Sequence, residues 1–154
     1  MNEVIIVSDL DRLQQFWSFF YEGFRALADN PKIKFEDTEQ EFQNVTIEAM
    51  TQWPEGGLVA VLVNKKDQPL AFGVMRESTL MFKPKTCFVY AVYSNELCKT
   101  AIQELNAYGY KWARKFGYKY MDAATRRMTG GAGYWFKKKM GMNLHFLHYR
   151  KEII

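Results

Sequence analysis

The sequence predicts a single α/β (α+β) domain over residues 1–154, with a mixed central sheet of about six strands flanked by four helices. Three observations lead to this fold class. Segments of strand pattern alternate with segments of helical periodicity. A clear hairpin pattern occupies the middle of the chain. Strands surround the two C-terminal helices, which implies a sheet covered on both faces.

The first half of the chain is expected to contain a strand, two helices and a hairpin. The first helix opens at a capping pair, Ser8 with Asp11, and stops at Pro31. The second opens at a capping box formed by Thr38 and Glu41. The predicted strands of this half are 3–7, 58–63 and 70–76, the last two joined by a turn over 64–68.

The second half is expected to alternate strands and helices. The predicted elements are a strand over 86–93, a helix over 98–116, a strand over 118–125, a helix over 134–140 and a strand over 144–151. Gly109 lies inside the long helix, where glycine costs about 1 kcal/mol relative to alanine. We therefore expect that helix to pack closely on the sheet at Gly109.

Composition restricts the class of protein. Hydrophobic residues make up 48% of the chain and aromatic residues 16%, which excludes disorder. No apolar run approaches ~20 residues and no signal-peptide pattern opens the chain, so we expect a cytoplasmic protein without membrane contact. Cys87 and Cys98 are expected to be reduced thiols. His145 and His148 are expected on opposite faces of one strand, so no metal site is predicted.

Charge is divided unevenly along the chain. Residues 1–100 carry 10 basic and 14 acidic side chains, whereas residues 101–154 carry 11 basic and 3 acidic. Arg126, Arg127 and Lys137–Lys139 belong to the basic part. They are expected to contact phosphates or a nucleic acid, or to form an ordinary solvated face. A polyanionic partner, which includes nucleotide cofactors, nucleic acids and acidic proteins, is consistent with this division.

The junction between the strand over 86–93 and the following helix is the main candidate site. A strand that leads into a helix N-terminus is a common phosphate-binding arrangement, although this junction contains no glycine. Lys99, with the N–H groups of Thr100 and Ala101, is the candidate phosphate contact. Glu96 is a candidate general base if burial raises its pKa, and otherwise an acidic residue that the helix dipole favours.

The element order and lengths of nearly the whole chain resemble the GNAT superfamily of acyl-CoA-dependent N-acyltransferases. That family has a loop of the form Val-x-Pro-x-x-Arg/Gln-x-x-Gly-x-Gly/Ala before a helix. The residues in register with the family are Val92, Leu105, Ala113 and Gly117. The loop residues that depart from it are Ser94, Leu97, Thr100 and Ile102. The divergence is similar to that of phage-type members.

A second family motif, Phe-Tyr-Glu-Lys-Leu-Gly-Phe, resembles residues 136–142 of this chain. Gly141 is retained, but Lys137 stands at the tyrosine that often serves as general acid in the family. Tyr134 lies one helical turn earlier and is the candidate replacement. Asp122, on the preceding strand, is expected to be a hydrogen-bonded structural residue.

The resemblance implies an N-acetyltransferase that uses acetyl-CoA as co-substrate and a small-molecule or protein amine as acceptor. The implied slot lies between two splayed parallel strands, near Tyr93 and Thr125, with Val92 and Tyr93 among the cofactor-binding residues. Strict alternation would put Tyr90 on the face of Val92, and a bulge after Ala91 would change this. Both tyrosines are candidates for proton donation or for wall packing.

The lost loop glycines and tyrosine leave an alternative open. The chain is then a non-catalytic GNAT-like module that binds nucleic acid or protein, acts as a phage structural component or self-associates into a homo-oligomer.

Overall fold

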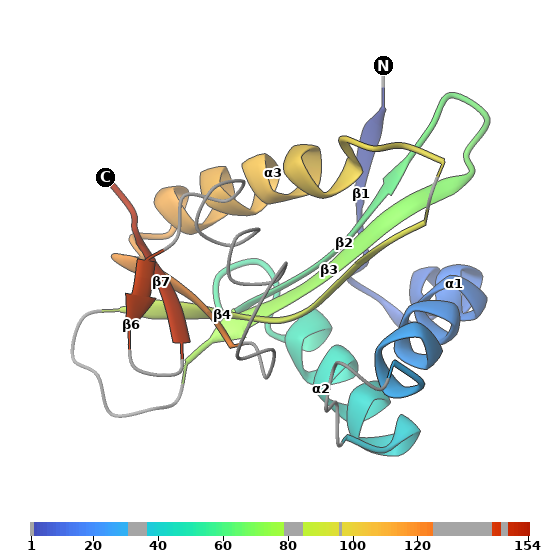
Figure 1. Ribbon diagram of the computed structural model, residues 1–154, viewed down its shortest axis with the longest axis horizontal. Helices are drawn as coiled ribbons and strands as arrows, with labels where there is room; N and C mark the ends of the chain where they lie inside the picture. The colour runs from blue at the N-terminus through green and yellow to red at the C-terminus, as the bar shows by residue number, and fades with distance from the viewer. Residues whose placement is uncertain (1, 31–36, 79–84, 96, 125–142, 146–147) are drawn as a thin grey trace.

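The computed structural model describes residues 2–30, 37–78, 85–95, 97–124, 143–145 and 148–154. Seven strands of this part form one mixed sheet in the order β1-β2-β3-β4-β5-β7-β6. The strands are β1 (Glu3–Ile6), β2 (Gly57–Val63), β3 (Pro69–Glu77), β4 (Thr86–Ser94), β5 (Tyr120–Ala124), β6 (Asn143–His145) and β7 (His148–Glu152). The helices are α1 (Leu10–Ala28), α2 (Glu39–Thr51) and α3 (Ala101–Lys115). Figure 1 shows α3 on one face of the sheet and α1 and α2 on the other.

Strands β1 to β4 pair antiparallel with their neighbours, and β4 pairs parallel with β5. A parallel pair requires a crossover connection, which helix α3 supplies. Strand β7 then returns antiparallel to β5. The predicted mixed α+β sheet is therefore confirmed.

The C-terminal segment differs from the prediction. The single strand expected over 144–151 is wrong, because β6 and β7 are two strands that pair antiparallel, with Asn143 opposite Arg150. His145 and His148 are register partners across this pair, so the expectation that they lie on opposite faces of one strand is also wrong. An antiparallel pair needs only a short connection, and no strong turn signal separates the two strands in the sequence. The helix predicted over 134–140 lies outside the described residues.

Two helices begin at side-chain caps. Asp9, and not the predicted Ser8, is the N-cap of α1, where its carboxylate accepts a hydrogen bond from the Arg12 N–H at 2.8 Å. The prediction missed by one residue because Ser8 and Asp9 are both good caps, and the exact start depends on how β1 enters the helix. The predicted capping box of α2 is confirmed. Thr38 accepts from the N–H of Glu41 at 3.2 Å, and Glu41 accepts from the N–H of Thr38 at 3.1 Å.

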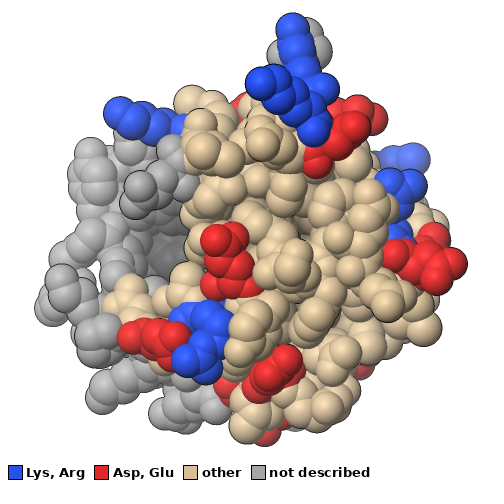
Figure 2. All heavy atoms as spheres, turned by 90° about the vertical axis from the view of Figure 1, so that its right-hand side faces the viewer, with Lys and Arg blue, Asp and Glu red and all other residues tan. Residues whose placement is uncertain are grey.

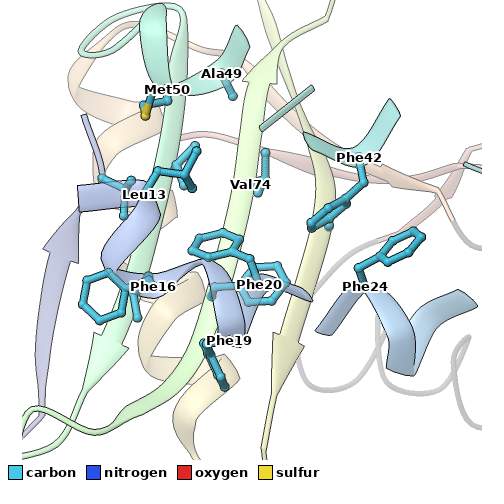
Figure 3. Packing of buried hydrophobic residues seen from close by; sticks show 14 of the residues in the cluster. Leu13, Phe16, Phe19, Phe20, Phe24, Phe42, Ala49, Met50 and Val74 are labelled. Carbon is cyan, nitrogen blue, oxygen red and sulfur yellow. The ribbon is translucent and has the colours of Figure 1, made fainter. Parts of the chain in front are cut away.

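Aromatic rings fill the space between the sheet and helices α1 and α2. Figure 3 shows the phenylalanine side chains of α1 directed toward the sheet, near Phe42 of α2 and Val74 of β3. The ring of Phe20 stacks on that of Phe72 at 4.3 Å between centroids. Gly23 allows this approach, because a Cβ there would lie 2.3 Å from the Phe72 ring. Each buried ring of this kind contributes about 2–3 kcal/mol to folding, and together they hold α1 on the sheet.

Close packing at a glycine and two side-chain hydrogen bonds position α3 on the opposite face of the sheet. Gly109 faces β3, where an added Cβ would lie 3.0 Å from the Met75 sulfur, so the predicted close packing of Gly109 on the sheet is confirmed. One turn after Gly109, Trp112 Nε1 donates to the carbonyl of Pro54 at 2.7 Å. The Tyr118 hydroxyl donates to the carbonyl of Glu55 at 2.7 Å. The position of α3, and therefore of its N-terminus, follows from these contacts.

Candidate functional site

The candidate site begins where β4 and β5 stop pairing. Their parallel register covers four positions, from Thr86 opposite Tyr120 to Val89 opposite Ala123. Strand β4 continues to Ser94, while β5 ends at Ala124. In the described part of the chain, the last five residues of β4 have no register partner on β5. That edge of β4 therefore leaves backbone N–H and C=O groups that β5 does not engage.

A β-bulge in β4 lies at the point of divergence. On β3, Val74 is opposite Ala91 and Met75 is opposite Val89, so Tyr90 is the extra residue. Bulges of this kind redirect side chains and end strand pairing. The sequence left a bulge after Ala91 open as an alternative to strict alternation. The structure has the bulge one residue before Ala91.

The bulge puts both candidate tyrosines on one side of the sheet. Tyr90 and Tyr93 pack with the α1 and α2 cluster, whereas Val89 and Val92 pack with the α3 cluster. The expectation from strict alternation, that Tyr90 shares a face with Val92, is therefore wrong. The physical reason is the extra residue, which shifts the alternation by one position.

Tyr90 is a hydrogen-bond donor beside the divergence. Its hydroxyl donates to Asp37, the residue before the N-cap of α2, and its ring lies 6.0 Å from that of Phe42. Burial, followed by the hydrogen bond to Asp37, raises the pKa of Tyr90 above its ordinary value. The phenol therefore stays protonated at neutral pH. Tyr93 forms ring contacts with Phe19 at 5.6 Å and Phe72 at 5.8 Å, as part of the wall of the cluster.

The segment between β4 and α3 is anchored to the start of β3. The N–H of Asn95 donates to the carbonyl of Leu70 at 3.0 Å, and its side-chain amide donates to the carbonyl of Pro69 at 2.9 Å. Leu97 follows with 69% of its surface exposed. Glu96, the predicted general base, lies outside the described residues, and so does Tyr134.

Helix α3 begins without a side-chain cap. Its N-cap, Thr100, has φ −101° and ψ 2°, and its hydroxyl forms no capping hydrogen bond. Ala101 is fully buried, and its N–H donates to the carbonyl of Cys98 at 3.4 Å. Lys99 is exposed immediately before this turn. The structure therefore groups Lys99, Thr100 and Ala101 at the start of α3, while Val92 and Tyr93 lie on opposite faces of β4.

A carboxylate that the sequence reasoning missed lies at this helix start. Glu104 accepts hydrogen bonds from the Thr100 hydroxyl and from the side-chain amide of Asn2, each at 3.1 Å. The Cys98 sulfur lies 3.8 Å from the same carboxylate. The spacing of four residues between Thr100 and Glu104 is a helical-neighbour signal that could have been noticed. Asn2 is 102 positions away and gave no signal.

The two thiols have different environments. Both cysteines are free, as predicted. Cys87 is fully buried in the paired half of β4, and burial raises the pKa of its thiol to about 12. Cys98 is partly exposed at the start of α3. Asp122 is buried on β5, opposite Phe88 of β4.

Other features of the described residues lie away from this junction. A cavity of about 300 Å³ between α1 and α2 has no lining residue from β4 or α3; it is lined by Leu10, Leu13, Gln14, Trp17, Gln43 and Ile47. Within the described ranges, no group of three or more His, Cys, Asp or Glu side chains could hold a metal ion. No helix of this part is long and apolar enough to cross a membrane.

Basic side chains do not gather on the side of the molecule that faces the viewer in Figure 2. The Lys and Arg residues drawn there form separate groups, and Asp and Glu residues lie between them on a largely tan surface. Arg126, Arg127 and Lys137–Lys139 lie outside the described residues. Contact with a polyanion therefore stays a prediction.

Comparison with solved structures identifies the fold. A GNAT-family acetyltransferase from Staphylococcus aureus superposes with a TM-score of 0.71 at 7% identity, covering 100% of both chains. An aminoglycoside 6'-N-acetyltransferase from Acinetobacter baumannii gives 0.67 at 13% identity, over 94% of this chain and 92% of the other. The ribosomal-protein-S18-alanine N-acetyltransferase of Escherichia coli gives 0.64 at 12% identity, over 99% and 94%.

No family model matches the sequence, and no curated protein matches it. The similarity is therefore one of structure at low sequence identity. The chain has the fold of the GNAT acetyltransferases, and the fold expected from the resemblance is confirmed.

Proposed function

We propose that the protein is an N-acetyltransferase that moves an acetyl group from acetyl-CoA to an amine. The observation that carries the proposal is the divergence of β4 from β5 after Val89, with the bulge at Tyr90 and the start of α3 close behind. In the described residues, this arrangement ends the pairing of β4 with β5 near a helix N-terminus that has no side-chain cap. The amide groups of the extended thioester arm of acetyl-CoA suit the end of β4, and its phosphates suit the N-terminus of α3.

The residues at the junction between β4 and α3 fit the acetyl donor, acetyl-CoA, in part. We assign the amides of the arm to the part of β4 beyond its pairing with β5, where Val92 lies. Backbone N–H groups and Lys99 at the start of α3 suit phosphate oxygens. Thr100 and Ile102 stand at the glycine positions of the family and restrict close approach of the backbone. The Glu104 carboxylate adds negative charge at the same place.

The chemistry requires a proton acceptor for the amine and a proton donor for the departing thiolate. We assign the acceptor role to Glu96, directly or through water, and the donor role to Tyr134 or Tyr93. A backbone N–H of β4 would stabilise the developing oxyanion. Holding the two substrates together in the slot supplies the remaining rate enhancement.

The acceptor is an amine of a small molecule or a protein. The structural neighbours include one enzyme named for aminoglycosides and one named for the alanine of a ribosomal protein. The shared chemistry of these acceptors is an amino group, and we extend only this feature to the present chain.

Binding of acetyl-CoA is the first test. Acetyl-CoA at about 100 times its Kd should stabilise the protein by about 2.7 kcal/mol. For a domain of this size the melting temperature should rise by roughly 5 °C or more. No shift at millimolar acetyl-CoA would argue against the proposal.

Transfer is the second test. Release of the CoA thiol in the presence of amines should depend on Glu96, and Glu96→Gln should lower kcat about 100-fold while acetyl-CoA binding is unchanged. Glu22→Gln, an exposed residue of α1, removes the same charge and should leave the rate unchanged. Equal rates for both variants would remove Glu96 from the mechanism.

A second candidate function is a non-catalytic module that binds a protein or nucleic acid. The observation that favours it is Glu104, because a carboxylate at the start of α3 opposes a bound phosphate. This candidate predicts stable self-association, or nucleic-acid binding that weakens steeply with salt. Size-exclusion chromatography and titration with nucleic acid at two salt concentrations measure both properties. A monomer with no nucleic-acid affinity at low salt would exclude these forms of the module.

A further inference from the structure

The Glu104 carboxylate is hydrogen-bonded by neutral groups. Its carboxylate accepts from the Asn2 amide at 3.1 and 3.3 Å and from the Thr100 hydroxyl at 3.1 Å. None of the three ion pairs of the described residues includes Glu104. Hydrogen bonds from neutral donors stabilise a carboxylate but leave its net charge in place. Glu104 therefore places a negative charge in the first turn of α3, five residues after the exposed Lys99.

The position of this charge is set by two distant parts of the chain. Asn2 directly precedes β1, and Thr100 precedes α3, so Glu104 joins the N-terminus of the chain to the first turn of the helix. The backbone N–H of Glu104 donates to the carbonyl of Thr100 at 3.0 Å, which places the residue in that first turn. The Glu104 side chain is exposed, and the hydrogen bonds from Asn2 and Thr100 hold its carboxylate at this turn.

We infer that Glu104 is a specificity-determining residue that weakens binding of donors carrying a diphosphate at the start of α3. The inference rests on the proposed function and concerns the donor side of the same site. Two like charges a few ångströms apart near a protein surface repel measurably. Donors that present the pantetheine thioester without phosphates escape this repulsion. The chain therefore discriminates against the charged part of acetyl-CoA and not against its thioester arm.

The test compares two donors on three proteins. Acetyl-CoA and S-acetylpantetheine, which lacks phosphates, are titrated by calorimetry into the unmodified protein, Glu104→Gln and Glu39→Gln. Glutamine at position 104 keeps an acceptor oxygen for Asn2 and Thr100 but removes the charge. Glu39 is exposed in the first turn of α2, so Glu39→Gln removes the same charge from another helix start. Melting temperatures verify that all three proteins are folded.

We expect the Glu104→Gln substitution to raise the affinity for acetyl-CoA alone. Glu104→Gln should bind acetyl-CoA about fivefold more tightly than the unmodified protein does. Its affinity for S-acetylpantetheine should be unchanged, and Glu39→Gln should match the unmodified protein for both donors. The fivefold gain should shrink as salt is raised from about 50 to 500 mM, because the repulsion is screened.

Three results would overturn the inference, and they separate it from the proposed function. Equal acetyl-CoA affinity of the unmodified protein and Glu104→Gln removes the role of Glu104 but retains the acetyltransferase. Weaker binding by Glu104→Gln shows that the carboxylate supports the site, which also overturns the inference. No binding of either donor by any of the three proteins overturns both the inference and the proposed function.

Discussion

The N-termini of helices α2 and α3 have the same pattern of residue types, but only that of α2 forms a capping box. Each has a threonine N-cap followed three residues later by a residue suited to a capping box, Glu41 in α2 and Gln103 in α3. In α2 the box is closed by two reciprocal hydrogen bonds. In α3 the Thr100 hydroxyl forms no cap, and the side-chain oxygen of Gln103 is buried without a hydrogen-bond partner.

The difference lies in the backbone that leads into each helix. Thr38 is extended, with φ −73° and ψ 165°, so its side chain reaches back to the N–H of Glu41. Thr100, with ψ 2°, is turned out of the extended region, and its hydroxyl reaches Glu104 instead. Asn95, five residues before Thr100, is hydrogen-bonded to the start of β3. Among the described residues, the N-terminus of α2 is closed by a capping box, whereas that of α3 has no side-chain cap.

The strongest test of a ligand site at the start of α3 is whether acetyl-CoA protects the thiol of Cys98 from modification. Cys98 lies at the start of α3, and a thiol reagent at pH 8 should modify it in the native protein. Acetyl-CoA at about ten times its Kd should slow that modification about tenfold. Cys87 is the internal control, since it is fully buried with a pKa raised to about 12 and should react only after unfolding. An unchanged Cys98 rate under saturating acetyl-CoA would contradict a ligand site at this helix start.

Replacement of the N-cap threonine should destabilise the protein more at α2 than at α3. Thr38→Ala deletes a cap, so the free energy of unfolding should fall by about 1 kcal/mol. Thr100→Ala deletes no cap, so the change should stay within about 0.5 kcal/mol. Urea denaturation of both variants measures the two values. Equal losses for the two variants would mean that Thr100 also caps its helix in solution.

The smallest effect concerns the unpaired oxygen of Gln103. Gln103→Leu removes a buried acceptor without a partner, so the free energy of unfolding should rise by about 0.5 kcal/mol. Gln40→Leu on α2 is the control, because Gln40 is exposed and its amide donates to Asn44 at 2.9 Å. That variant should gain nothing in urea denaturation. A loss of stability in Gln103→Leu would indicate that its oxygen is hydrogen-bonded in solution.

Much of the fold was predictable because it depends on local signals. The helical periodicity of Phe16, Phe20 and Phe24 predicted α1, and the Thr38–Glu41 box predicted the start of α2. Gly109 predicted a close helix–sheet contact, because a glycine inside a helix needs a compensating reason. The division of the last strand into β6 and β7 was not predictable, since it depends on pairing with β5 and not on local pattern.

The candidate site was predictable only in part. The sequence indicated the strand–helix junction and the residues Lys99, Thr100 and Ala101 at the start of α3. The bulge at Tyr90 was foreseen only as an alternative and one residue away, because a bulge arises from the register against β3. The hydrogen bond from Asn2 to Glu104 joins residues 102 positions apart, which no local pattern reports.

By itself the sequence determined the order of helices and strands from β1 to β5, the caps of α2 and the place of the strand–helix junction, because these depend on residues close together in the chain. The tertiary structure decided where β4 leaves β5, which face Tyr90 and Tyr93 occupy and which charge stands at the start of α3. These features depend on strand register and on contacts between distant segments. The proposed donor site at this junction, and the proposed effect of Glu104 on it, therefore depend on the tertiary structure.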